Sequence, residues 1–176
     1  MNLLHASFPK VASAMVHDGL YHPTVVRLLR SSESRCHCSV FIVDHDLRAD
    51  VELRVDSVLV ELAGAAWRGV DVKLLIGGSR RNRQIRDAAM LAWARARELG
   101  IDARLAAASK HNDSHAKIVV TDRHVLVGSH NWSRGMFGAE TQDSVLLESA
   151  ALAAALDTYF TGCWQKAARD EYDASL

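Results

Sequence analysis

This chain of 176 residues lacks the features that mark membrane and secreted proteins. No run of apolar residues approaches the roughly 20 residues that a helix needs to cross a bilayer. Residues 1–10, MNLLHASFPK, lack the basic start and apolar segment of a secretory signal. No lysine-rich amphipathic helix tipped with aromatic residues stands out for docking on a lipid surface. We therefore expect a cytoplasmic protein without stable membrane association.

An excess of charge of one sign is also missing. The 21 lysines and arginines are balanced by 21 aspartates and glutamates, so the formal net charge is zero. Overall charge thus gives no support for a nucleic-acid partner, which would have to bind to a local basic cluster.

Cysteine is scarce, with Cys36, Cys38 and Cys163 as its three positions. An odd number of cysteines in a chain without a secretory signal indicates reduced thiols rather than a disulfide framework. Cys36 and Cys38 would point to one face of a strand, but a metal site of this type needs a second pair at a suitable spacing. The sequence has none, so we interpret both as small buried residues.

The sequence does have the composition of a globular protein and the hydrophobic patterns of alternating strands and helices. Hydrophobic residues make up 49% of the chain, and its length suits one domain with a substantial core. Apolar runs predict strands at 38–44, 70–78, 101–106 and 143–149, and periodic apolar residues predict helices at 55–66, 85–96, 152–164 and after Pro23. This order predicts a single α/β domain over residues 1–176, with a mixed, mostly parallel sheet sandwiched between helices. Residues 1–20 would form an N-terminal extension.

One stretch, SHAKIVVTDRHVLVGSHNWS at residues 114–133, combines two apolar strands with polar residues at their ends. A hairpin with a three-residue turn would place His115 opposite Ser129 and Lys117 opposite Val127. Because side chains alternate along a strand, His115 and Lys117 share a face. Burying such groups is costly unless each has a partner, so these positions indicate a functional role.

The end of this hairpin gathers groups that suit phosphate chemistry. The Lys117 ammonium can bind a phosphoryl oxygen as a point charge, and the Ser129 hydroxyl and Asn131 amide can donate hydrogen bonds to other oxygens. The His115 imidazole can act as a nucleophile or as an acid and base near neutral pH. No acidic cluster is present in the sequence to hold magnesium. We therefore expect a reaction that uses no metal ion and no other cofactor.

The spacing of these residues resembles the signature of the phospholipase D superfamily. His115-Ala116-Lys117 is followed after four residues by Asp122, and then by Gly128-Ser129-His130-Asn131. The resemblance implies the α-β-α fold of that superfamily, with His115 as the nucleophile that forms a covalent phosphohistidine. It implies that Lys117 and Asn131 bind the phosphate and that Ser129 assists there. Asp122 would serve orientation and local structure.

The same resemblance implies an acidic residue after the motif that pairs with the imidazole of His115. Asp143, at the start of the last predicted strand, is the candidate, and Glu140 is the alternative. The superfamily often has Asn-x-Glu at this place, whereas this chain has Thr141-Gln142-Asp143.

The chain lacks a second His-x-Lys. The chemistry needs two histidines, because one attacks phosphorus and the other protonates the leaving oxygen. Small single-motif members of the superfamily solve this by forming homodimers, in which a two-fold axis brings identical residues together. The resemblance therefore implies a homodimer in which His115 of both subunits forms one site.

Length and a single motif favour a nuclease that acts on DNA or RNA, similar to the small bacterial endonucleases of the superfamily. The expected substrate-binding residues are Arg80, Arg81 and Arg83 in a basic loop, Lys110 and His111 before the motif, and Trp132, which would stack on a base or cap the core. His130 should point away from the site. A phospholipase D-type hydrolase or transphosphatidylase acting on phospholipid is an alternative, as is a catalytically silent nucleic-acid-binding subunit.

Overall fold

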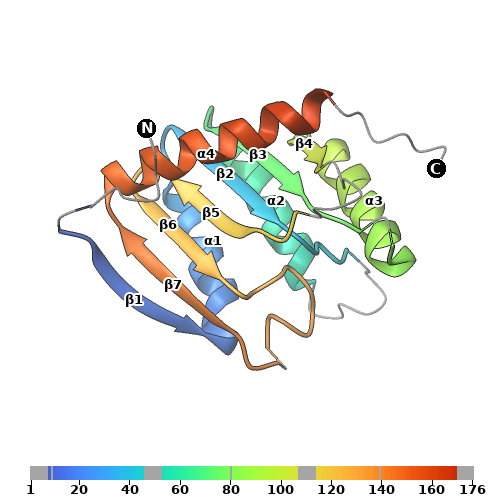
Figure 1. Ribbon diagram of the computed structural model, residues 1–176, viewed down its shortest axis with the longest axis horizontal. Helices are drawn as coiled ribbons and strands as arrows, with labels where there is room; N and C mark the ends of the chain where they lie inside the picture. The colour runs from blue at the N-terminus through green and yellow to red at the C-terminus, as the bar shows by residue number, and fades with distance from the viewer. Residues whose placement is uncertain are drawn as a thin grey trace.

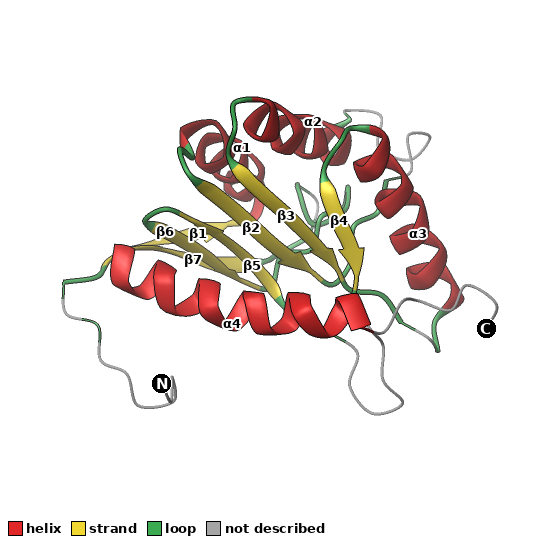
Figure 2. Ribbon diagram, turned by 90° about the horizontal axis from the view of Figure 1, so that it is seen from above, coloured by secondary structure: helices red, strands yellow, loops and turns green. Residues whose placement is uncertain are grey.

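The computed structural model describes residue 8 and residues 10–45, 53–79, 81–106, 114–138 and 140–169. Within these ranges, seven strands form one mixed sheet between two layers of helices, which confirms the predicted fold class (Figures 1 and 2). In chain order the elements are β1 (Ala12–His17), the short 3-10 helix η2 (Asp18–Leu20), α1 (Tyr21–Ser31), β2 (Arg35–Val40), α2 (Arg54–Trp67), β3 (Asp71–Ile76), α3 (Arg83–Glu98), β4 (Asp102–Leu105), β5 (Lys117–Thr121), β6 (His124–Gly128), β7 (Asp143–Glu148) and α4 (Ala150–Arg169).

The strands follow the order β1-β7-β6-β5-β2-β3-β4 across the sheet. Strands β2, β3 and β4 are parallel, while the remaining neighbours are antiparallel, so the parallel part is smaller than the sequence indicated. As a result, β2, β3 and β6 end where β5 and β7 begin. We call this side of the sheet the carboxyl edge; the arrowheads of β2, β3 and β6 mark it in Figure 1.

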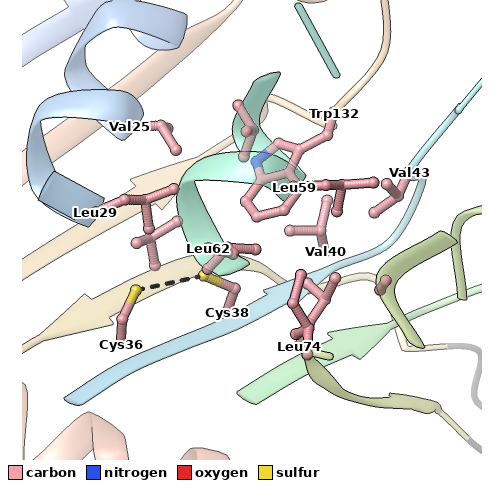
Figure 3. Close-up of a cluster of buried hydrophobic side chains, with 14 of the residues drawn as sticks. Val25, Leu29, Cys36, Cys38, Val40, Val43, Leu59, Leu62, Leu74 and Trp132 are labelled. Atoms are coloured by element: carbon pink, nitrogen blue, oxygen red, sulfur yellow. Dashed lines mark hydrogen bonds between the residues drawn. The ribbon is translucent and has the colours of Figure 1, made fainter. Parts of the chain in front are cut away.

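Helices α1, α2 and α3 cover one face of the sheet and α4 crosses the other (Figure 2). The larger core lies on the first face, where Val25 and Leu29 of α1 and Leu59 and Leu62 of α2 pack toward β2 and Trp132 (Figure 3). None of the helices in the described ranges is both long and apolar enough to cross a membrane.

The two cysteines of β2 point into this core. Cys36 and Cys38 are fully buried free thiols, and their Sγ atoms lie 3.9 Å apart (Figure 3). This confirms the prediction that they are small buried residues.

Strand β2 differs from the strand expected at residues 38–44, since it starts at Arg35 and ends at Val40. Its first half was missed because it is polar. His37 is buried on the α4 side, where its Nδ1 lies 2.5 Å from Asp157 Oδ1 and its ring stacks on Phe160 with centroids 4.9 Å apart. A polar residue whose partner lies 120 positions later leaves no trace in a local hydropathy pattern.

The segment expected as an N-terminal extension supplies the edge strand β1. It pairs with β7 from Ala12–Glu148 to His17–Asp143. Val16 is its one buried residue, because only one strand neighbours it. A strand so exposed shows little of the apolar alternation that identified the other strands.

The β5–β6 hairpin forms as predicted, but its expected register was wrong by one residue. Ile118 pairs with Val127 and Val120 with Val125, because the turn between the strands contains two residues rather than three. On its other side β5 pairs with β2, with Val40 opposite Lys117. The hairpin therefore joins the parallel half of the sheet to the antiparallel half.

Candidate active site

His115 and Lys117 meet at the carboxyl edge, at the point where β5 begins. Lys117 Nζ lies 2.9 Å from His115 Nδ1 and donates a second hydrogen bond of 2.9 Å to the His115 carbonyl oxygen. Because an ammonium group is a donor only, Nδ1 is the acceptor, and a neutral ring then carries its proton on Nε2. The structure thus brings together the two residues on which the predicted chemistry depends.

The surroundings of this pair favour an uncharged imidazole. His115 is exposed overall, but partial burial of its ring lowers its pKa, and the nearby charge of Lys117 lowers it further. Burial also lowers the pKa of Lys117, which is only 7% exposed. A neutral imidazole has the lone pair that a nucleophile needs, so the electrostatics suit attack on an electrophile near neutral pH.

Asn131 reaches the same edge through the chain that follows β6. Its Oδ1 accepts a hydrogen bond of 3.0 Å from the backbone N–H of Ile42, and its side chain is buried. Ile42 also accepts a hydrogen bond of 2.9 Å from the backbone N–H of Trp132. Since the backbone occupies the amide oxygen, the orientation of Asn131 is fixed and its NH2 group is the part that can donate to a ligand.

Phe41, the residue after β2, packs against the histidine–lysine pair. Its ring centroid lies 4.3 Å from that of His115, and Lys117 Nζ lies 5.3 Å from the ring centroid. Gly77, the residue after β3, packs closely against this segment from the other side. A Cβ at Gly77 would lie 2.6 Å from the Phe41 Cα and 2.8 Å from the backbone carbonyl oxygen of Ser114. No residue with a side chain fits at Gly77 without moving the backbone on which His115 depends.

Ser129 and Asp143 join β6 to β7 at the same edge. The backbone N–H of Ser129 donates to the backbone carbonyl oxygen of Asp143 at 2.9 Å, and the backbone N–H of Asp143 donates to Ser129 Oγ at 3.1 Å. Both side chains are exposed. Within the part of the chain that the structure describes, no hydrogen bond joins the Asp143 carboxylate to His115. The expected pairing of these two residues stays a prediction, and Glu140 lies exposed in the loop before β7.

Asp122 lies at the opposite end of β5 and does not contact the pair. Its carboxylate accepts hydrogen bonds from the backbone N–H groups of Glu33 at 2.8 Å and of Ser34 and Arg35 at 3.1 Å, and from the Ser34 hydroxyl. Burial alone would raise the pKa of Asp122, but these hydrogen bonds hold it below its ordinary value. The motif aspartate therefore fastens the turn after β5 to the start of β2, which agrees with the structural role expected for it.

Two residues next to the motif belong to the core. Trp132 is fully buried in the core (Figure 3), and its Nε1 lies 3.3 Å from the Tyr21 hydroxyl. Of its two expected roles, stacking on a base and packing in the core, the structure therefore shows the second and not the first. His130 is also buried, stacks on Tyr21 with centroids 4.1 Å apart, and lies 2.8 Å from Ser144 Oγ through Nδ1. His130 thus points away from the edge, as the sequence predicted.

The other expected substrate-binding residues lie before α3 and before β5. Arg81 is exposed, and Arg83 at the start of α3 is exposed with its Nε 3.3 Å from Asp87 Oδ2. Arg80, Lys110 and His111 lie outside the described residues. Within the described ranges, no three His, Cys, Asp or Glu side chains gather in a way that would hold a metal ion.

Sequence reasoning missed Phe41, Ile42 and Gly77. Phe41 and Ile42 read only as the end of an apolar strand. The pair Gly77-Gly78 after β3 indicates that another segment of backbone approaches closely there, but the sequence does not identify that segment.

The comparisons with known proteins agree with this geometry. A sequence model of the family described as "Cardiolipin synthase, PLD-like domain" matches residues 25–164. Among solved structures, the phospholipase D family member Nuc from Salmonella typhimurium is 20% identical with a TM-score of 0.70, covering 89% of this chain and 96% of its own. NucT from Helicobacter pylori is 13% identical with a TM-score of 0.61, covering 89% of this chain and 98% of its own.

A third similar structure comes from a larger protein. The phosphatidylserine synthase of Haemophilus influenzae Rd KW20 is 11% identical with a TM-score of 0.60, covering 91% of this chain but only 40% of its own. A search of curated proteins found no match.

Proposed function

This chain belongs to the phospholipase D-like family, and on that premise we propose that it is a metal-independent nuclease that forms a covalent phosphohistidine on His115. The observation that carries the proposal is the contact between the His115 imidazole and the buried Lys117 ammonium at the carboxyl edge. It unites a neutral nucleophile with a cation that can bind a phosphoryl oxygen.

Binding of substrate prepares the nucleophile. A phosphodiester oxygen attracts the Lys117 ammonium, because charge-assisted hydrogen bonds to phosphate are strong. Lys117 then leaves His115 Nδ1, and the ring proton can reside on Nδ1, so that the lone pair of Nε2 is free. The Asn131 NH2 group and the Ser129 hydroxyl donate to the remaining oxygens, and Asp143 is the candidate acceptor for the Nδ1 proton.

The reaction then runs in two steps. Nε2 of His115 attacks phosphorus, a P–N bond forms, and the bond to the leaving oxygen breaks while a second histidine protonates that oxygen. Water loses a proton to the same second histidine and attacks phosphorus, which breaks the P–N bond and releases the second product with a terminal phosphate. No electrons are exchanged with another molecule, so no redox partner is needed.

The second histidine is proposed to be His115 of another subunit. The sequence has one His-x-Lys, and an isologous dimer places identical groups about its axis. His115 is exposed at the carboxyl edge, which leaves room for a second imidazole to approach.

Nucleic acid is the preferred substrate because the chain matches Nuc and NucT over nearly their whole length, whereas it covers less than half of the phosphatidylserine synthase. The family description, which names cardiolipin synthase, favours phospholipid as the second candidate. A silent binding subunit has less support, since it would not need His115 and Lys117 in contact.

End-labelled single-stranded DNA, duplex DNA and RNA, incubated with the purified protein in EDTA, test the proposal. We expect cleavage that persists in EDTA, is absent from His115→Ala, and leaves a phosphohistidine that can be trapped by acid-free denaturation. Release of head groups from phospholipid vesicles without cleavage of any nucleic acid would replace the nuclease with the lipid enzyme. Cleavage retained by His115→Ala would overturn the mechanism for both substrates.

A further inference from the structure

The segment Phe41–Ile42, which leaves β2 at the carboxyl edge, contacts three of the residues proposed to act on the phosphate, namely His115, Lys117 and Asn131. We propose that Phe41 is a positioning residue, whose ring fixes the orientation of the His115 imidazole and holds it beside Lys117 before substrate binds. The inference rests on the role of His115 in the proposed function, but it can be tested without turnover.

The first observation is what the Phe41 ring touches. Phe41 is only 9% exposed, yet among the described residues it belongs to none of the three hydrophobic clusters that form the core. Its ring instead lies against the imidazole of His115, at an interplanar angle of 39°, and within cation–π distance of Lys117 Nζ. A buried phenylalanine usually packs on apolar neighbours, so two polar contacts of this kind point to the site rather than to the core.

The second observation is that the backbone beneath the ring is fixed on both sides. Ile42 donates to Asn131 Oδ1 and accepts from the Trp132 N–H. On the other side, Gly77 approaches the Phe41 backbone so closely that a Cβ would collide with it. The Phe41 side chain therefore extends from a rigid support, whereas His115 precedes β5 and has no strand neighbours in the described ladders.

The consequence for His115 is restricted rotation and reduced access to water. An imidazole at the end of a strand samples several rotamers, and attack on phosphorus requires one of them. The Phe41 ring blocks rotation toward β2 and excludes water from one side of the imidazole. The lowered pKa of His115, caused first by burial and then by Lys117, agrees with this arrangement.

The test compares wild-type protein with Phe41→Leu, Phe41→Met and Phe41→Tyr. Nuclear magnetic resonance follows the ring signals of His115 against pH, with the signals assigned by their absence from His115→Ala. Phe137→Leu is the matched control, because Phe137 is a fully buried aromatic residue that packs on Tyr21 and His22 away from the site.

We expect Phe41→Leu and Phe41→Met to raise the pKa of His115 toward its ordinary value, while Phe41→Tyr and Phe137→Leu leave it unchanged. Where turnover is measurable, kcat should fall about 10-fold or more in the two variants without a ring, with a smaller change in KM. Phe41→Met retains an apolar side chain of similar size, so it answers the question if Phe41→Leu fails to fold.

An unchanged His115 titration in a folded Phe41→Met protein would overturn the inference, as would an equal shift in Phe137→Leu. The titration does not depend on substrate. A wild-type protein that cleaves nothing would therefore refute the proposed function while still deciding whether Phe41 controls His115.

Discussion

Lys117 Nζ and His115 Nδ1 lie 2.9 Å apart, and the ammonium donates to the imidazole. This contact occupies the lysine in the absence of substrate and keeps a positive charge beside the histidine. The two groups proposed to act on one phosphate are thereby held next to each other before it binds.

Replacing Lys117 should reveal its two expected effects, one on the pKa of His115 and one on phosphate binding. In Lys117→Ala, loss of the neighbouring charge should raise the pKa of His115, since that charge is one cause of the lowered value. Loss of a charge-assisted phosphate contact should also reduce kcat/KM by a factor on the order of 10² or more. Titration of the His115 ring signals and steady-state kinetics give the two results. An unchanged pKa of His115 in a folded variant would contradict the contact seen here.

The pH dependence of kcat/KM should reflect the lowered pKa of His115 in its two proposed roles, nucleophile in one subunit and proton donor in the other. Protonation of His115 removes its lone pair, and because its pKa is lowered, the nucleophile stays active below the ordinary histidine value of about 6.5. In the other subunit His115 must instead be protonated to donate to the leaving oxygen, so activity should also fall as the pH rises and this imidazole loses its proton, before Lys117 loses the charge that binds the phosphate. A pH–rate profile in EDTA checks both limits. An acidic limit above the ordinary histidine value would show that a different group limits the rate.

Asp122→Asn should affect stability and leave the chemistry intact. The carboxylate accepts several hydrogen bonds from residues 33–35, so its replacement should cost about 1–2 kcal/mol in the free energy of unfolding. Because the folded pKa of Asp122 is lowered, its contribution is present above the unfolded pKa and is lost as the pH falls through the folded value. Denaturant unfolding at pH 7 and at acidic pH measures this. If Asp122→Asn were destabilised as much at acidic pH as at pH 7, the effect would not come from the ionised carboxylate. A large loss of kcat at a temperature where the variant is folded would show that Asp122 takes part in the reaction.

Mixed dimers test whether the site is shared. If each site needs His115 from both subunits, an equal mixture of wild-type and His115→Ala chains should lose about half of its activity after the subunits exchange. The loss arises because half of the dimers become mixed and inactive. The mixture before exchange is the control, and light scattering gives the mass of the species. Activity that does not change on exchange would mean that each chain carries a complete site.

The fold was largely predictable from sequence, but the supports of the site were not. Local patterns identified the β5–β6 strands, and the motif spacing identified His115, Lys117 and Asn131. The register was missed by one residue because a two-residue and a three-residue turn read alike in a sequence that contains Asp122 and Arg123. The role of Trp132 was left between stacking and packing, since an aromatic residue beside a motif fits both until its neighbours are known.

Long-range contacts account for the remaining gaps. Phe41 meets His115, and Asn131 meets Ile42, across separations of 74 and 89 residues (115 minus 41 and 131 minus 42). Hydrophobic periodicity reports on one element at a time, so it contains no information about such pairs. The one usable signal was the glycine pair after β3, which indicated close approach without naming its partner.

The pairing of β2 with β5 also bears on how the protein is made. Residues 36–40 pair with residues 117–121, and the hydrogen bond from the Glu33 N–H to the Asp122 carboxylate joins the same two distant segments of the chain. Contacts so distant along the chain form slowly, because the intervening segment must be ordered first. In a nascent chain emerging from the ribosome, His115 therefore cannot take its place beside β2 until β5 has followed β2, β3 and β4 out of the exit tunnel. A translation product that ends before residue 115 lacks this histidine altogether, so under the proposed function it could not cut nucleic acid.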